Sequence, residues 1–179
     1  MNSTPDVLPA WATEEIVIEE YNPVWPLMAS ILIRELKTLH TFEDARFEHI
    51  GSTAVPDLAG KPVIDILLPV NDFDDLDTIV VALQPENWNL IPPELAVKDD
   101  HRTFVKVVKE KRAAHFHLIN NERDIKRHIA FRDALRQNPE LANEYAKLKT
   151  ELAETYKNDR EGYTAAKVEF IKTALSLNN

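Results

Sequence analysis

Residues 49–68, HIGSTAVPDLAGKPVIDILL, contain two of the three glycines of the chain and end in an apolar run from Val63 to Leu68. Prolines flank this run, and its length and composition predict a β-strand that is covered on both faces. Asp65 is the only charged residue within it. A carboxylate in such a strand is costly unless a cation or hydrogen-bond donors meet it. The sequence therefore predicts a partner for Asp65.

Composition narrows the class of protein. A chain of 179 residues buries one substantial core, and we expect one domain over 1–179, with an α/β part over about 13–120 and helices over about 121–177. The net charge of −9 and pI near 5.2 argue against extended nucleic-acid binding and an anionic membrane surface, and leave room for a small anionic ligand. With no cysteine, membrane span or signal peptide visible, we expect a cytoplasmic location.

Periodicity outlines the first two thirds of the chain. Apolar residues at three- and four-residue spacing predict helices over about 25–39 and 72–83. Residues 46–50 alternate as a strand, which places His49 on the face opposite to Ile50. We also expect strands over 16–18, 88–93, 103–109 and 114–119, the last two as a hairpin, and a solvated turn over 98–102.

The C-terminal third reads as three helices. They are expected over about 123–136, from about 138, and after 159–162, each with a capping residue or a proline at its start. Arg132 in the first helix and Lys167 in the third fall in line with apolar residues.

These inward-facing cations have two interpretations. A long cationic side chain often lays its stem over the core and places its charge in water. Alternatively, the cations surround Asp65 in one pocket that would hold an anion. The set that this second interpretation brings together is His49, Lys61, His115, His117, Arg132 and Lys167.

The turn Gly51-Ser52 also has two interpretations. It can be a simple turn and helix cap, or it can let the backbone approach a phosphate while the hydroxyl and amides donate to it. Phosphoryl and nucleotidyl transfer need such donors on one side of the phosphate and carboxylates that hold a metal on the other. Asp65 on the next strand supplies one such carboxylate.

Two other chemistries use the same residues. Ser52, His117 and Asp65 are the residue types of a catalytic triad, but the sequence lacks the Gly-x-Ser-x-Gly elbow. His115 and His117 share one face of a strand and could bind a metal, although alternate positions also suit one buried histidine and one at a pocket rim.

Four motifs in order resemble the GrpB family, also called uncharacterised protein family 0157. They are residues 49–66, His115-Phe-His117-Leu, Phe131-Arg132-Asp133-Ala134-Leu135, and Tyr163-Thr-Ala-Ala-Lys167-Val-Glu-Phe170-Ile. The resemblance runs from about residue 16 to 175. It implies an α/β, nucleotidyltransferase-like fold of the polymerase-beta type, with a mixed sheet, flanking helices and a C-terminal helical segment. In some bacteria a related domain is fused to dephospho-coenzyme A kinase.

The chain departs from the superfamily pattern at its acids. That pattern has a Gly-Ser turn, a strand with two acids at alternate positions, and usually a third acid on a later strand. Here the position two after Asp65 is Leu67, and the later strand offers His115 and His117. Two-metal catalysis needs at least two carboxylates, so a single acid would hold Mg²⁺ weakly.

The sequence thus leads to one main functional hypothesis, the binding of a nucleotide or phosphorylated small molecule, with nucleotidyl or phosphoryl transfer as the reaction it could support. Asp65 would hold Mg²⁺ or Mn²⁺ and His117 would act as acid or base. The phosphate would be held by His49, Gly51, Ser52, Lys61, His115, Arg132 and Lys167. A non-catalytic anion-binding module and a metal-dependent hydrolase remain as alternatives.

Overall fold

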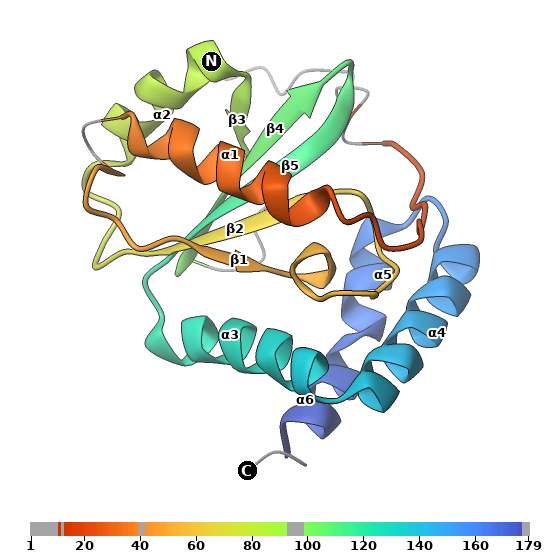
Figure 1. The fold of residues 1–179 in the computed structure, drawn as a ribbon. Helices are drawn as coiled ribbons and strands as arrows, with labels where there is room; N and C mark the ends of the chain where they lie inside the picture. Colours follow the sequence, from red (N-terminus) through yellow and green to blue (C-terminus); the bar gives the residue numbers. More distant parts are fainter. Residues whose placement is uncertain (1–10, 12, 40–41, 93–98, 177–179) are drawn as a thin grey trace.

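The computed structural model describes residues 11, 13–39, 42–92 and 99–176 (Figure 1). Five strands and six α-helices are found in this part of the chain, together with two short 3-10 helices, one between β1 and β2 and one directly before β3. In chain order the elements are α1 (Trp25–Lys37), β1 (Glu48–Ile50), η3 (Ser52–Ala54), β2 (Ile64–Pro69), α2 (Leu76–Leu83), η4 (Gln84–Glu86), β3 (Trp88–Leu90), β4 (His101–Val108), β5 (Lys111–Ile119), α3 (Glu122–Gln137), α4 (Pro139–Thr155), α5 (Arg160–Ala166) and α6 (Val168–Ser176).

The strands form one mixed sheet in the order β1-β2-β5-β4-β3. β2 runs parallel to β5, and the other neighbouring pairs are antiparallel. The parallel register places Asp65 beside His115 and Leu67 beside His117. Because side chains alternate along a strand, these four residues lie on the same face of the sheet.

Helices cover both faces of the sheet. α1 and α2 pack on the face that carries Ile64, Ile66 and Leu68, in the largest apolar cluster of the protein. α3 covers the opposite face, to which Asp65 belongs, and contacts β1, β2 and β5 (Figure 1). The mixed sheet with flanking helices, and the prediction that β2 is covered on both faces, are thus confirmed.

The C-terminal helices pack on the loop that follows η3. Val55 and Leu58 of this loop join buried residues of α3, α4 and α6 in a second apolar cluster. α4 begins with Asn138, whose side chain accepts hydrogen bonds from two backbone amides, and with Pro139 in its first turn, as its sequence predicts. The helical segment is therefore seated against the Gly51-Ser52 turn.

Several element boundaries differ from the sequence predictions. Residues 16–18 form no strand. The amide of Ile16 donates to the carbonyl oxygen of Lys157, and the neighbouring Glu19 forms an isolated bridge with Gly60. The turn expected over 98–102 is wrong for its last two residues, because β4 already begins at His101. Of the ranges predicted, residue 93 and residue 98 lie outside the described part of the chain.

The last predicted helix is two helices. α5 ends at Ala166 and α6 begins at Val168, so that Lys167 lies at the junction. The β4–β5 hairpin turns at Lys109 and Glu110, both of which have positive φ, and β5 begins at Lys111 rather than at residue 114 as predicted. None of the helices in the described part of the chain combines the length and the apolar character needed to cross a membrane.

Candidate functional site

The site begins with the close approach of Gly51 to Asp65. Gly51 follows β1 and has φ 72°, ψ −172°, a conformation that is essentially restricted to glycine. A Cβ atom at this position would collide with Oδ2 of Asp65. The absence of a side chain therefore lets the turn pack directly against the carboxylate.

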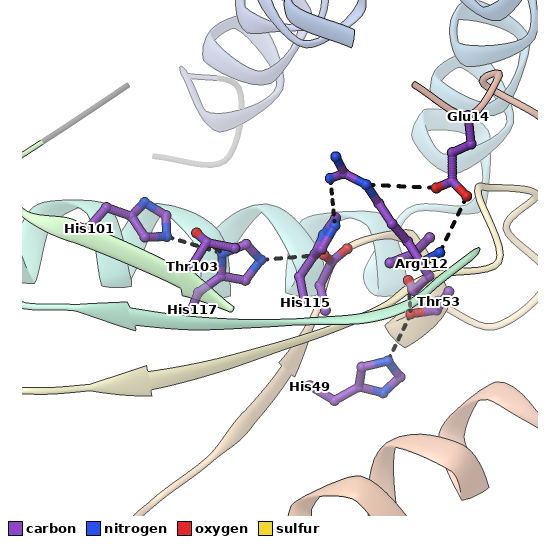
Figure 2. Close-up of polar contacts among 10 residues, drawn as sticks. Glu14, His49, Thr53, His101, Thr103, Arg112, His115 and His117 are labelled. Carbon is purple, nitrogen blue, oxygen red and sulfur yellow. Dashed lines mark hydrogen bonds and ion pairs between the residues drawn. The ribbon is translucent and has the colours of Figure 1, made fainter. Parts of the chain in front are cut away.

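Two histidines of β5 meet the other oxygen of this carboxylate. Nδ1 of His115 lies 2.9 Å from Oδ1 of Asp65, and Nε2 of His117 lies 3.4 Å from the same oxygen. The predicted need of Asp65 for a partner is thus met by imidazoles. Figure 2 shows His115 and His117 side by side on one face of the sheet.

Arg112 determines the tautomer of His115. Its Nη1 lies 3.3 Å from Nε2 of His115, and because a guanidinium can only donate, Nε2 must be the accepting nitrogen. The imidazole proton is then on Nδ1, which donates to Asp65. Burial lowers the pKa of His115 to about 4, despite the opposing effect of Asp65, so this imidazole is neutral at pH 7.

The environment of Asp65 keeps it ionised. Burial by itself would raise its pKa, but the hydrogen bonds from His115 and His117 outweigh burial and hold the pKa well below the usual range. Asp65 is therefore an anion whose nearest partners are the imidazoles of His115 and His117. Among the described residues, no lysine or arginine forms an ion pair with Asp65, although its charge raises the pKa values of Lys61 and Lys167 against the effect of burial.

The row of polar residues continues along β4. Nδ1 of His117 lies 3.1 Å from both Oγ1 of Thr103 and Nε2 of His101 (Figure 2). His101 was assigned to a turn by its sequence, and its place in the site was missed for that reason. The alternation of His101 and Thr103, facing Ile119 and His117 across the hairpin, is the signal that could have found it.

Three lysines gather beside the Gly51-Ser52 turn. The ammonium groups of Lys61 and Lys167 lie over the ring of Tyr163, at 5.1 and 4.3 Å from its centroid. Burial and neighbouring positive charges lower the pKa of Lys61 to about 8 and that of Lys167 to about 7. Both lysines were predicted from the sequence, and the structure brings them together.

Lys149 is the third lysine, and sequence analysis missed it. It is 2% exposed, and its ammonium donates to Oγ of Ser52 at 2.8 Å and to the carbonyl oxygen of Ala59. Burial, and then the charges of Lys167 and Lys61, lower its pKa to about 7. Its four-residue spacing from Tyr145 places it on the buried stripe of α4, which is the pattern that could have identified it.

Within the described part of the chain, none of these three lysines forms an ion pair with a carboxylate. Nearby arginines are different, because Glu14 lies 2.8 Å from Arg160 and 3.7 Å from Arg112. The lysine cluster, defined as Lys61, Lys149 and Lys167, is therefore a group of three basic side chains, one buried and two half-buried, in a chain whose net charge is −9.

Two predicted site residues lie elsewhere. All three guanidinium nitrogens of Arg132 are engaged by Glu48, Asp133 and the carbonyl of His49, at 2.6 to 3.2 Å. The structure therefore does not bring Arg132 into the lysine cluster. The side chain of His49 lies on the opposite side of the sheet from His115, where its Nε2 is 2.9 Å from Oγ1 of Thr53 (Figure 2).

The donor set does not fit the metal pair of the nucleotidyltransferase superfamily. Mg²⁺ takes oxygen ligands, and a two-metal site needs at least two carboxylates. Asp65 is flanked here by two imidazoles, and Leu67, at the second acid position, is fully buried against Ile50 and Ile119. We therefore derive no catalytic step through Mg²⁺.

The mixed sheet with its flanking helices, and a Gly-Ser turn between β1 and the strand that carries Asp65, define the class of this protein as mixed α/β. More narrowly, the model of the family described as "GrpB protein" matches residues 15–176, and the chain belongs to the GrpB family.

Relatives of known sequence or structure agree with this assignment. The chain is 32% identical over 161 residues to the UPF0157 protein YqkA of Bacillus subtilis, covering 89% of this chain but only 46% of that protein. It is 33% identical to a UPF0157 protein of Pseudomonas aeruginosa, covering 90% of this chain and 67% of the relative. The crystal structure of GrpB from Enterococcus faecalis is 31% identical, with a TM-score of 0.78 over 90% of this chain and 99% of that chain.

Proposed function

We propose that this protein binds a nucleotide or another phosphorylated small molecule, and that the lysine cluster holds its phosphate. The observation that carries the proposal is the meeting of three lysines, with Lys149 buried and bonded to Ser52 and the other two over the ring of Tyr163. No carboxylate is paired to them in the described part of the chain. Desolvated like charges repel one another, and an anion between them would relieve that repulsion.

Electrostatics links phosphate binding to proton uptake. Because the pKa values of Lys149 and Lys167 are lowered to about 7, both ammonium groups are partly deprotonated at neutral pH. A bound phosphate favours the charged forms and raises both pKa values. Binding therefore takes up protons near pH 7 and weakens as the pH rises above it.

The proposal stops at binding and does not include nucleotidyl transfer. The transferase alternative needs a second carboxylate next to Asp65, and Leu67 occupies that position inside an apolar cluster. The residues that support phosphate binding are Lys61, Lys149, Lys167 and the Gly51-Ser52 turn. His115 and His117 contact Asp65, and they support no phosphate contact in this proposal.

A thermal-shift panel tests this function. Inorganic phosphate, pyrophosphate and ATP, each with and without Mg²⁺ and compared with chloride at equal ionic strength, should raise the melting temperature in the absence of the metal. Lys167→Met should remove most of the shift, and Lys147→Met, at an exposed position of α4, should retain it. No shift by any of these compounds would contradict the proposal, and a shift seen only for ATP with Mg²⁺ would favour the transferase alternative.

A further inference from the structure

We propose that Asp65, His115 and His117 form a binding site for one divalent transition-metal ion, with Zn²⁺ as the best-fitting ion. One oxygen of Asp65, Nδ1 of His115 and Nε2 of His117 all lie within 4.8 Å of one another. Two imidazoles and one carboxylate are a donor set of zinc and related transition metals, whereas Mg²⁺ takes oxygen ligands. This inference does not rest on the proposed phosphate binding.

The distances between these atoms suit a shared ion. Ligand atoms about 2.0–2.1 Å from a tetrahedral Zn²⁺ are separated from one another by roughly 3.3 Å. The separations from Oδ1 of Asp65 to the two histidine nitrogens are 2.9 and 3.4 Å. All three ligand atoms lie within 4.8 Å of one another, so small rotations of the side chains bring them to the distances of a shared ion.

The surroundings of His117 suit a metal ligand. If Nε2 of His117 binds the ion, its proton must be on Nδ1, which then needs an acceptor. Oγ1 of Thr103 and Nε2 of His101 both lie 3.1 Å from Nδ1 and can accept this hydrogen bond. Such contacts fix the tautomer and orientation of a ligating histidine.

The carboxylate is held in place independently of the histidines. Gly51 packs against Oδ2 of Asp65 so closely that no larger residue fits, while Oδ1 is directed at both imidazoles. The ligands come from neighbouring parallel strands in a paired register, which is a rigid support. Three protein ligands leave a tetrahedral ion one position for water or for an oxygen of a ligand.

Arg112 would respond to the ion. When Nδ1 of His115 binds a metal, the imidazole proton moves to Nε2, which then faces the donating Nη1 of Arg112 at 3.3 Å. Two donors cannot share this contact, so Arg112 must move away. Arg112→Gln supplies an amide oxygen that can accept from Nε2 and removes a positive charge near the ion. We therefore expect this variant to bind the ion more tightly.

The test is a titration of the chelator-treated full-length chain with Zn²⁺ alone, in competition with a chromophoric chelator. We expect one ion per chain, and each of Asp65→Asn, His115→Gln and His117→Gln should weaken binding by about 100-fold or more. His128→Gln replaces a histidine of α3 that is not one of the three proposed ligands. It is the matched control and should change Zn²⁺ affinity less than about threefold. Circular dichroism at the titration temperature shows whether each variant is folded.

Two further measurements test the Zn²⁺ site if a ligand variant fails to fold. Co²⁺ in place of Zn²⁺ should give the visible absorption bands of a low-coordinate site, and Arg112→Gln should bind Zn²⁺ more tightly than the wild type. Absent cobalt bands, equal weakening by His128→Gln, or displacement of Zn²⁺ by equimolar Mg²⁺ would each overturn the proposal. Lys147→Met, at an exposed position of α4, should leave Zn²⁺ affinity unchanged. Zn²⁺ is titrated without phosphate, so a failure of phosphate binding does not affect this result.

Discussion

Nζ of Lys149 lies 2.8 Å from Oγ of Ser52, and this contact joins residues 97 positions apart in the sequence. It ties α4 of the helical segment to the turn that follows β1. The turn singled out by its Gly-Ser sequence is therefore completed by a residue from the C-terminal third of the chain. The site belongs to neither part alone.

Because of Lys149, the free energy of unfolding should depend on pH in the alkaline range. Its folded-state pKa of about 7 lies below the ordinary value of 10.5, so between these values the unfolded chain binds more protons than the folded chain. The free energy of unfolding then rises with pH over this range, and below pH 7 this contribution is constant. Lys149→Met should flatten the rise by a few kcal/mol, on the order of 2 to 4. Guanidinium unfolding at pH 7 and pH 9.5 measures it, with Lys147→Met as control.

Histidines should make the protein labile to acid. Burial lowers the pKa values of His49, His115 and His128 to about 4, below the ordinary 6.5. Between pH 6.5 and 4 the unfolded chain binds more protons, so stability falls as the pH falls through this window. In His128→Gln, the free energy of unfolding lost between pH 7 and pH 5 should be smaller than in the wild type by on the order of 1–2 kcal/mol. An unchanged difference between the two pH values in chemical unfolding would argue against a buried neutral His128.

Gly51→Ala should be strongly destabilising. The substitution forces an L-residue into φ 72°, and its Cβ would meet Oδ2 of Asp65. Backbone strain of this kind costs about 1–3 kcal/mol, and the collision adds to it. We expect a loss of about 2–4 kcal/mol in urea unfolding. Ser52→Ala, which removes only a hydrogen bond, should cost about 1 kcal/mol; equal losses for the two variants would contradict this account.

Leu67→Asp should not create a second metal-binding acid. Leu67 is fully buried between Ile50 and Ile119, where a carboxylate would be desolvated without a cation. The expected cost is at least that of Leu67→Ala, about 2–5 kcal/mol, with the burial of a charge added to it. Thermal melts of both variants provide the comparison. An aspartate variant as stable as the wild type, and binding Mg²⁺, would show that this position can accept the acid.

Much of the fold followed from local pattern. The apolar run around Asp65, the periodicity of α1 and α3, and the Asn-Pro start of α4 predicted elements that the structure contains. The 16–18 strand failed because β-branched residues there pack against other groups, with Ile16 donating its amide to Lys157 rather than to a strand. The break at Lys167 was missed because the apolar stripe continues across it.

The site was harder to predict than the fold. Lys167 was found because it falls in line with apolar residues of its helix, and Asp65 because it is the one acid in a buried strand. Lys61 was included only with the set of cations expected around Asp65. Lys149 was missed because the predicted apolar stripe of its helix runs through a neighbouring position. Its role depends on a contact with Ser52 that the local sequence does not encode. Arg132 lies on the inward face of its helix, as predicted, but it forms ion pairs with the carboxylates of Glu48 and Asp133. Which cations keep a free charge is set by tertiary neighbours.

Phosphate binding depends most on the lysine cluster, and calorimetric titration with pyrophosphate in the absence of divalent metal tests this binding most directly. The wild type and Lys147→Met should bind one pyrophosphate per chain, with protons taken up at pH 7 because the pKa values of Lys149 and Lys167 lie near 7. The proton uptake is measured by repeating the titration in buffers of different ionisation enthalpy. Lys149→Met should bind at least about tenfold more weakly, which corresponds to about 1.4 kcal/mol. Equal affinities for Lys149→Met and the wild type, or binding without proton uptake, would contradict the central claim.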